Sequence, residues 1–340
     1  MVTTPTSPYT LPRLDGQRVL VTGGLGFIGS NLAHRCLSLG AEVTIYDCLD
    51  PRSGGNMQNV ASIKNDVHIV LNDVRNFEGI SAAVLDKDIV FNCAAYTSHP
   101  NAMKEPFVDV DVNCKGVLNV LEALRRFSAD AKLVHIGTST QIGAMKYSPI
   151  DENHPEMPVD IYSANKSASE KYVLVYAHAY RLRNTVVRLA NVYGPRSNIR
   201  SSDFGFMNFF IGLGLKGKDI TIFGEGKQLR TISFIDDCVD ALILSAETPA
   251  MDRDVYFAVS DQQYSVKEVG EAIAQHVGGK VRFIEWPKNR EVIEVGDAVI
   301  SNAKIRGAVG WEHKTSLESG LLKTKEYFEP RMKHYMDLAL

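Results

Sequence analysis

Tyr162 and Lys166 have side chains and a spacing that suit acid–base chemistry. They lie in the run IYSANK, which we expect to begin a helix, and a separation of four residues places both side chains on one helix face. An ammonium close to a phenol stabilises the phenolate and so lowers the pKa of the tyrosine. The pair therefore predicts a general base that takes a proton from a hydroxyl group, with an ordinary helical pair as the alternative.

Thr138, Ser139 and Thr140 form a second group of candidate residues. These three hydroxyls follow Lys132–Ile136, an apolar run that we predict to be a buried strand. Side chains at the carboxyl end of a central strand lie where α/β sheets bind their ligands. A hydroxyl there can donate a hydrogen bond to the substrate oxygen that Tyr162 deprotonates. We favour Thr138 for this role, and the other two hydroxyls remain alternatives.

A glycine-rich loop, VTGGLGFIG, begins at Val21 and joins a predicted strand to a predicted helix. Its glycines give both GxxGxxG and GxGxxG, and glycine lets the backbone approach a pyrophosphate closely. The free N–H groups and the dipole at the start of the following helix attract that anion. We therefore expect a dinucleotide to contact Gly23, Gly26, Phe27, Ile28 and Gly29.

Asp47 directly follows the next predicted strand, 18 residues after Gly29. An acidic residue near this offset binds the adenosine ribose hydroxyls of a dinucleotide. Its carboxylate would repel a 2′-phosphate, so we expect NAD in preference to NADP. Arg52 is close in the sequence, and an arginine in this region can accommodate that phosphate, which keeps NADP as the alternative.

Apolar runs that alternate with helical segments must position these residues. Continuous apolar strands between helices predict a parallel sheet covered on both faces, which is a doubly wound α/β fold of Rossmann type. The expected helices include Phe27–Leu39, Pro106–Phe127 and Ile161–Arg183. The expected strands are Arg18–Thr22, Glu42–Tyr46, Val67–Leu71, Asp88–Phe91, Lys132–Ile136 and Thr185–Leu189.

The alternation weakens after Pro195, where we expect a smaller α/β substrate-binding lobe to begin. Ile220–Phe223 is a predicted strand of that lobe, whereas Arg230–Ala246 returns to the βα pattern of the main domain. Residues 1–15 are polar and rich in Thr and Pro, and they predict a flexible lead-in. The predicted division is a dinucleotide-binding domain at 16–195 and 231–250, and a lobe at 196–230 and 251–340.

The bulk composition limits the classes of partner. The 340 residues carry a formal net charge of −3, which lacks the basic excess expected of a protein that binds nucleic acid or an anionic membrane surface. No apolar stretch is long enough for a membrane span. Five cysteines without CxxC spacing and histidines without an HxxxH pair predict no disulfide framework and no metal site, in a reducing cytoplasm.

The glycine loop, Asp47, the strand-end hydroxyl and the YxxxK pair, in this order, resemble the extended short-chain dehydrogenase/reductase family. The specific branch is similar to the NAD-dependent nucleotide-sugar epimerases and dehydratases, over about Arg18 to Tyr327. Asn92 stands where that family usually has His. The resemblance implies NAD as cofactor, with further contacts from Asp73, Val74, Cys93, Ala94, Ala95, Asn113, Tyr162 and Lys166.

The resemblance also implies how a nucleotide sugar is bound. Asn191 in the segment RLANVYGP is expected near the substrate diphosphate, and Arg230 in FGEGKQLR would clamp it with a planar, always charged guanidinium. Thr231 stands where the family usually has Asp, and Ile142 where it usually has Tyr. The implied substrate-binding residues are Thr97, Thr138, Ser139, Asn191, Phe223, Arg230 and Arg290.

The implied chemistry begins with oxidation of a sugar C4 hydroxyl by bound NAD. Dehydratases and decarboxylases of the family carry a carboxylate in the turn after the catalytic threonine, whereas this turn reads TSTQ. We therefore expect a UDP-sugar 4-epimerase with a transient 4-keto intermediate, because inversion at C4 needs no such group. The alternatives are a 4,6-dehydratase, an epimerase that acts at another carbon or on a CDP-, GDP- or dTDP-sugar, and a non-catalytic NAD-binding regulatory protein.

The family resemblance further implies a homodimer. The helices expected at 106–127 and 161–183 would pair with those of a second copy in a four-helix interface. The apolar faces of both helices are also explained by packing against the sheet, so the sequence by itself leaves the oligomeric state open.

Overall fold

A parallel sheet of seven strands forms the centre of the computed structural model, which describes residues 9–50, 52–288 and 294–336. All neighbouring strands pair in parallel, in the order β11-β6-β5-β4-β1-β2-β3. This confirms the predicted doubly wound α/β fold. The strands are β1 (Arg18–Thr22), β2 (Glu42–Asp47), β3 (His68–Leu71), β4 (Ile89–Asn92), β5 (Lys132–Thr138), β6 (Arg183–Leu189) and β11 (Val255–Phe257).

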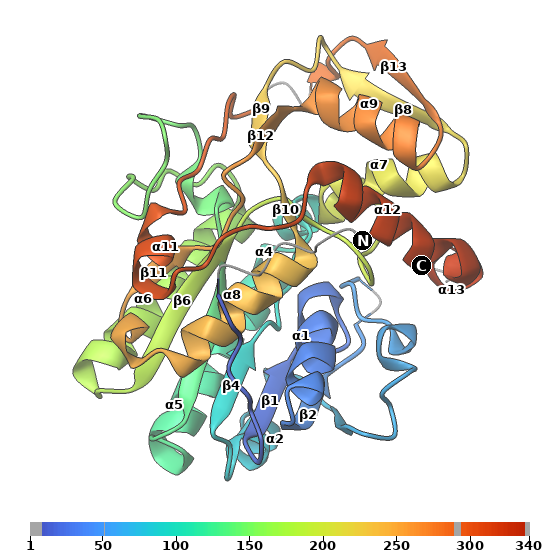
Figure 1. The fold of residues 1–340 in the computed structure, drawn as a ribbon. Helices are drawn as coiled ribbons and strands as arrows, with labels where there is room; N and C mark the ends of the chain where they lie inside the picture. Colours follow the sequence, from blue (N-terminus) through green and yellow to red (C-terminus); the bar gives the residue numbers. More distant parts are fainter. Residues whose placement is uncertain (1–8, 51, 289–293, 337–340) are drawn as a thin grey trace.

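Helices cover both faces of the sheet because its strands are apolar on both faces (Figure 1). Val19 and Val21 of β1 face the layer formed by α1 (Phe27–Ser38) and α8 (Ile235–Glu247). Leu20, between them, faces the opposite layer. That layer contains α2 (Phe77–Val84), α5 (Val117–Phe127) and α6 (Ile161–Ala179).

The helix predicted at Pro106–Phe127 is continuous but not uniform. It begins as α4 (Pro106–Asp109), passes through a π-helical segment, η2 (Val110–Gly116), and continues as α5. Segments with this wider turn often accompany functional sites. The other long helix ends at Ala179, four residues earlier than predicted, because Arg181 adopts a left-handed backbone conformation with φ of 58°.

Most of the remaining elements form a smaller layer above the carboxyl ends of the central strands, whereas α11 (Ala303–Val309) lies beside the edge strand β11 (Figure 1). Two short sheets pair β8 (Asp219–Phe223) with β13 (Lys280–Ile284), and β9 (Leu229–Thr231) with β12 (Gln263–Ser265). A third pairs β7 (Val192–Tyr193) with β10 (Ser233–Phe234). The other helices are α3 (His99–Lys104), α7 (Phe206–Leu215), α9 (Val266–His276), α11 (Ala303–Val309), α12 (Leu317–Phe328) and α13 (Met332–Met336), with short helical turns at η1 (Met57–Val60), η3 (Thr140–Ile142), η4 (Ser202–Phe204), η5 (Pro249–Met251) and η6 (Glu329–Arg331).

Two segments differ from their predicted places. Val255–Phe257, assigned to the smaller lobe, is the edge strand β11 of the central sheet, next to β6. In the predicted lead-in, residues 1–8 lie outside the described residues. Tyr9 and Leu14 are buried, and the Tyr9 hydroxyl donates to Asp240 of α8 at 3.0 Å. Apolar side chains thus hold this part of the lead-in against the domain.

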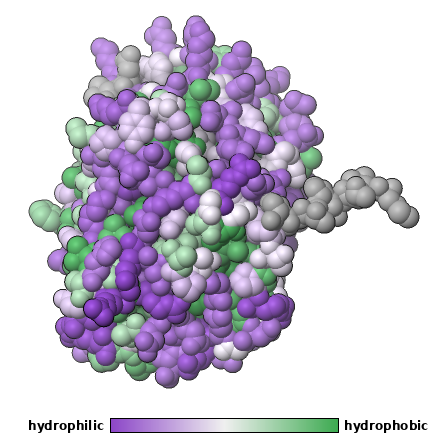
Figure 2. Space-filling view, turned by 60° about the vertical axis from the view of Figure 1, so that its left-hand side comes forward, coloured by the Kyte–Doolittle hydropathy of each residue, from purple (hydrophilic) through white to green (hydrophobic). Residues whose placement is uncertain are grey.

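Among the described residues, none of the helices combines the length and the apolar character that crossing a bilayer requires. On the face shown in Figure 2, hydrophobic residues lie in patches between hydrophilic ones.

Candidate active site

A cavity of about 960 Å³ lies at the carboxyl ends of the central strands, beneath the smaller layer. The parallel strands all end at this edge of the sheet, so side chains from distant parts of the sequence meet there. The cavity wall includes 18 of the predicted site residues, which are Gly23, Gly26, Phe27, Ile28, Gly29, Asp47, Asp73, Val74, Cys93, Ala94, Ala95, Thr97, Thr138, Ser139, Tyr162, Lys166, Asn191 and Arg230.

The glycine loop leaves a cradle that side chains would fill. A Cβ atom on Gly29 would lie 2.3 Å from the carbonyl oxygen of Gly23, and one on Gly23 would lie 2.7 Å from the backbone nitrogen of Ala94. Helix α1 begins at this loop, and its N-cap residue, Gly26, has no side chain to satisfy the free N–H groups. The bare backbone and the positive end of the helix fit the pyrophosphate of a dinucleotide.

Asp47 is almost buried at the end of β2 and is held in place by the backbone. Its two carboxylate oxygens accept hydrogen bonds from the N–H groups of Leu25 at 3.0 Å and Leu49 at 2.8 Å. Burial raises the pKa of Asp47, and these two hydrogen bonds oppose that shift. The carboxylate therefore has a defined orientation in the part of the cavity where we expect an adenosine ribose.

Arg52, which left NADP open as the cofactor, is engaged by acidic side chains. Its guanidinium lies 2.9 Å from Asp50 and 3.3 Å from Glu105. On the same side of the cavity, Asp73 pairs with Arg75 at 2.7 Å. Both arginines are thus neutralised by carboxylates, which favours NAD over a cofactor that carries an additional phosphate.

Asn113 has a different position from the one predicted. It lies outside the cavity wall, is 1% exposed, and binds both the N–H and the carbonyl group of Tyr96. Its side chain also donates to Asp109 at 2.9 Å. Asn113 lies in the π-helical segment and holds the loop after β4, while its direct contact with a cofactor stays a prediction.

Tyr162 and Thr138 form one wall of the cavity. Tyr162 lies in the first turn of α6, whose N-cap residue Asp160 accepts a hydrogen bond from the N–H of Ser163. Thr138 is the last residue of β5, and its hydroxyl side chain acts to lower the pKa of Tyr162. The expectation of a lowered tyrosine pKa is wrong for this structure, because burial raises the pKa of Tyr162 and the charges of Asp109 and Asp160 raise it further.

Lys166 is buried beneath Tyr162 and has polar partners within the sheet. Its ammonium donates to the carbonyl oxygen of Ile136 at 2.7 Å and lies 3.4 Å from Nε2 of His135. The hydrogen-bonded chain continues from His135 to Asn92 at 3.1 Å and from Asn92 to Thr22 at 2.7 Å. Burial lowers the pKa of Lys166 to about 8, so its charge is easily perturbed.

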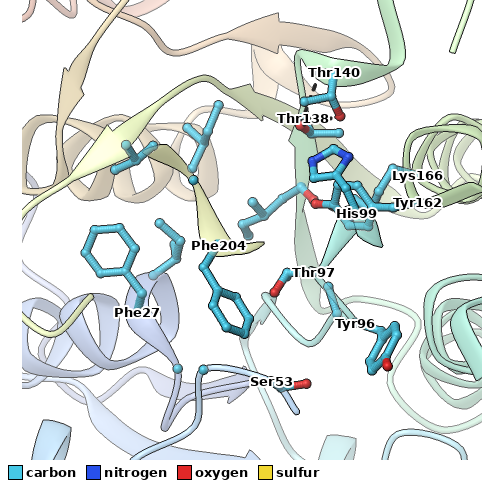
Figure 3. A pocket seen from close by; sticks show the side chains of 18 of the residues that line it. Phe27, Ser53, Tyr96, Thr97, His99, Thr138, Thr140, Tyr162, Lys166 and Phe204 are labelled. Carbon is cyan, nitrogen blue, oxygen red and sulfur yellow. Dashed lines mark hydrogen bonds between the residues drawn. The ribbon is translucent and has the colours of Figure 1, made fainter. Parts of the chain in front are cut away.

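His99 and Asp160 also belong to this wall, and sequence reasoning missed both. Nδ1 of His99 lies 2.8 Å from Asp160, and the imidazole packs edge-on against the Tyr162 ring with 4.7 Å between centroids. Figure 3 shows His99 in front of Tyr162, below Thr138 and Thr140. The pair joins residues 61 positions apart, so no local motif marks it. The signal that could have found Asp160 is its place directly before the predicted catalytic helix, because aspartate is a common N-cap residue.

Arg230 and Asn191, the two residues expected at the substrate diphosphate, also line the cavity. Arg230 pairs with Glu294 at 2.7 Å and donates to the carbonyl oxygen of Gly296. Asn191 donates to the carbonyl oxygen of Thr231 at 2.9 Å, and its backbone has φ of 41°. Phe223 lies outside the cavity wall and instead packs against Trp286. Arg290 lies outside the described residues.

The segment after β7 adds cavity residues that no motif predicted. Phe204 ends η4, and Figure 3 shows its ring within the cavity, between Phe27 and Thr97. Asn208 of α7 also lines the cavity and donates to the carbonyl oxygen of Val192 at 2.9 Å. These residues extend the wall from the glycine loop toward Arg230.

Comparison with known proteins identifies the chain at the level of family. A model of the NAD dependent epimerase/dehydratase family matches residues 19–292. The chain belongs to this family. The cradle at the glycine loop and the orientation of Asp47 fit the cofactor that defines the family, and NAD is therefore the cofactor of this chain.

Individual members of the family show how varied its reactions are. The chain is 31% identical to the UDP-glucose 4-epimerase of Mycolicibacterium smegmatis over 92% of its own length and 98% of that protein. It is 28% identical to UDP-glucuronic acid decarboxylase 1 of Xenopus tropicalis, over 95% of this chain and 75% of that one. The solved Thermus thermophilus UDP-glucose 4-epimerase, in complex with NAD, is 30% identical with a TM-score of 0.83, covering 93% and 100% of the two chains.

Proposed function

We propose that the chain is a nucleotide-sugar epimerase that inverts C4 of a UDP-sugar through a transient 4-keto intermediate. The observation that carries the proposal is the wall of Tyr162, Thr138 and Lys166, followed by a turn that contains hydroxyls but no carboxylate. The likeness to UDP-glucose 4-epimerases supports UDP as the nucleotide and C4 as the carbon.

Each residue of this wall has a distinct task in the proposed reaction. When bound, NAD would accept a hydride from the sugar carbon and later return it. Tyr162 Oη takes the proton of the C4 hydroxyl and returns it after the sugar has turned over in the cavity. Thr138 donates a hydrogen bond to the same substrate oxygen, and the positive charge of Lys166 favours the ionised phenol. Arg230 and Asn191 hold the diphosphate while the sugar reorients.

Replacement of Tyr162 by Phe tests the proposal. The variant keeps the ring that fills the wall but loses the base, so turnover should fall by at least about 100-fold while NAD binding persists. The assay incubates the protein with UDP-glucose, UDP-galactose and their N-acetyl and uronic acid counterparts, and separates products by stereochemistry. A protein with full turnover after Tyr162→Phe would refute an enzymatic role for this wall.

One observation favours a second candidate, a nucleotide-sugar 4,6-dehydratase. His99 and Asp160 place a second acid–base pair beside Tyr162, and inversion at C4 does not require one. Elimination of water needs both a base at C5 and an acid at C6, which such a pair can serve. A product lighter than its substrate by one water, with solvent deuterium at C5, would identify the dehydratase.

We also propose that two copies associate through α4–α5 and α6, in a cytoplasmic setting. Phe107 of α4 and Val175 of α6 are 82% and 57% exposed, so both would lose apolar surface to water if these helices met a second copy. All five cysteines are free, in keeping with a reducing compartment. Sedimentation velocity should give a dimer for the natural sequence and a monomer for Val175→Asp.

A further inference from the structure

Leu25 joins two parts of the cofactor site, the glycine loop and the carboxylate of Asp47. Its side chain is completely buried, whereas Gly23 and Gly26 on either side of it line the cavity. Its backbone N–H donates to the Asp47 carboxylate at 3.0 Å. A shift of Leu25 would therefore displace the bare backbone of the loop and the carboxylate together. Whatever holds Leu25 in place bears on how well the site fits NAD.

The carbonyl oxygen of Leu25 is held by two asparagines from the segment around η1. The backbone N–H of Asn56 donates to it at 3.0 Å, and Nδ2 of the Asn59 side chain donates to it at 2.9 Å. Both lone pairs of this carbonyl group are thereby used, which fixes its direction. Asn59 is 2% exposed and lies behind the cavity wall, so water does not compete for its bond to Leu25.

Helix α13 binds both of these asparagines, although it lies at the far end of the described chain. Oη of Tyr335 donates to Oδ1 of Asn59 at 2.6 Å. Nδ2 of Asn56 donates to the carbonyl oxygen of His334 at 3.2 Å. The carbonyl group of Leu25 can only accept, so Nδ2 of Asn59 must face it, which leaves Oδ1 for the phenol. One buried amide thus links α13 directly to the glycine loop.

The phenol of Tyr335 is itself held in one orientation. Its hydroxyl proton is used by Asn59, so Tyr327, whose Oη lies 2.5 Å away, donates to it. The guanidinium groups of Arg196 and Arg331 lie 5.2 Å and 4.7 Å from the centre of the Tyr327 ring. Arg196 also donates to the backbone carbonyl oxygen of Asn59 at 3.1 Å. The tyrosine pair and η1 therefore form one connected unit.

We propose that Tyr335 is a positioning residue for NAD, which acts through Asn59 and Leu25 on the glycine loop. While Tyr335 donates to Oδ1, the Asn59 amide stays turned toward Leu25, and the loop and Asp47 keep the arrangement that receives the dinucleotide. A loop that is ordered before its ligand arrives loses less conformational freedom on binding, which raises affinity. The proposal concerns the cofactor alone and depends neither on the sugar nor on the reaction.

Tyr335→Phe tests the proposal in the full chain, freed of nucleotide. The variant keeps the ring but leaves Oδ1 of Asn59 buried without its donor, so the amide is free to turn away from Leu25. Titration calorimetry should show a dissociation constant for NAD that is about fivefold larger, which corresponds to one ordinary hydrogen bond. A dissociation constant equal to that of the natural sequence would overturn the proposal.

Tyr9→Phe is the matched control for a loss of stability. It removes the hydroxyl of another buried tyrosine, which ties its segment to Asp240 of α8 and not to the glycine loop. This variant should be less stable and bind NAD normally. A fivefold weaker affinity in Tyr9→Phe as well would show that NAD binding follows overall stability, and the proposal would fail.

A double-mutant cycle tests whether the effect passes through Asn59. Asn59→Ala removes the amide that joins Tyr335 to Leu25 and should weaken NAD binding by itself. In that background Tyr335→Phe should cause no further loss, because residues that act through one contact are not additive. Two losses that add in full would show that Tyr335 acts by another route and would refute the assigned path.

Hydrogen exchange provides a test on the natural sequence, without any substitution. If α13 strengthens NAD binding, then NAD must stabilise the docking of α13 by the same factor. Amides of residues 332–336 should therefore exchange about fivefold more slowly with saturating NAD. Helix α11, which packs beside β11, reports the protection that comes from stabilising the whole protein. Equal slowing in the two helices would contradict the coupling.

Discussion

The ammonium of Lys166 lies 3.4 Å from Nε2 of His135, inside the sheet and away from solvent. Burial and the charge of Lys166 lower the pKa of His135 well below its usual value, so the imidazole is neutral. The same burial lowers the pKa of Lys166 to about 8. A lysine held in this way makes the protein less stable whenever it must be charged.

Lys166→Met should therefore alter the pH dependence of stability in the NAD-free protein. The unfolded lysine has a pKa of about 10.4, so between pH 8 and about 10 the unfolded chain binds more protons and stability rises with pH. Across this pH range the free energy of unfolding of the natural protein should rise by on the order of 3 kcal/mol relative to that of Lys166→Met, if the full pKa difference between the folded and unfolded lysine contributes. Urea denaturation at several pH values measures this, and parallel curves for the two proteins would contradict it.

Arg188→Met should be strongly destabilising. Arg188 is 2% exposed and lies 2.6 Å from Glu170, which is completely buried. Removal of the guanidinium takes away the buried countercharge of Glu170, which keeps its contacts with Lys171 and Gln141, so the loss of unfolding free energy should be about 3 kcal/mol, the lower end of the range for a broken buried pair. The matched control is Arg126→Met, which breaks a surface pair with Glu122 and should cost less than about 1 kcal/mol. Equal losses in the two variants would contradict the structural assignment.

Gly29→Ala should abolish tight NAD binding. The new Cβ would lie 2.3 Å from the carbonyl oxygen of Gly23, so the loop must move away from the position that receives the pyrophosphate. Titration calorimetry should show a dissociation constant for NAD that is at least about tenfold larger, which corresponds to a loss of about 1.4 kcal/mol or more of binding free energy. Gly307→Ala, where nothing lies within 4 Å of the added carbon, is the control and should bind NAD normally.

Asp47→Asn should reduce the preference for NAD over NADP. The substitution preserves the shape of the side chain and one acceptor oxygen but removes the charge that repels a 2′-phosphate. We expect NAD affinity to fall about tenfold, the usual effect of losing a hydrogen bond to a charged group. Arg52→Gln should leave NAD affinity unchanged, since Asp50 and Glu105 already engage that arginine. Stronger discrimination in Asp47→Asn would show that the carboxylate does not face the ribose.

Local patterns were sufficient to predict the parts of the site that lie on single elements. The glycine loop, Asp47 and the Tyr162–Lys166 spacing each depend on one strand end or one helix, and the structure places all of them in the cavity wall. The fold was predictable for the same reason, because apolar strands that alternate with helices have few other arrangements.

Contacts between distant segments were not predictable. His99 meets Asp160 only because α3 packs against α6, and Arg230 meets Glu294 through the pairing of short segments in the smaller layer. Asn113 has the expected motif around it, yet the wider turn of η2 directs its side chain to Tyr96. The raised pKa of Tyr162 likewise depends on burial and on the charge of Asp109, which lies 53 positions earlier in the sequence and belongs to a different motif.

The pairing of Arg230 with Glu294 has a consequence for how a charged ligand enters. If a diphosphate binds Arg230 as proposed, it does so by ion exchange, in which one anion replaces another on the same guanidinium. The incoming ligand then competes with a tethered carboxylate whose effective concentration is independent of ligand supply. This competition makes the site selective, because a singly charged sugar would displace Glu294 less readily than a diphosphate. Abundant anions that bind weakly would therefore not occupy Arg230.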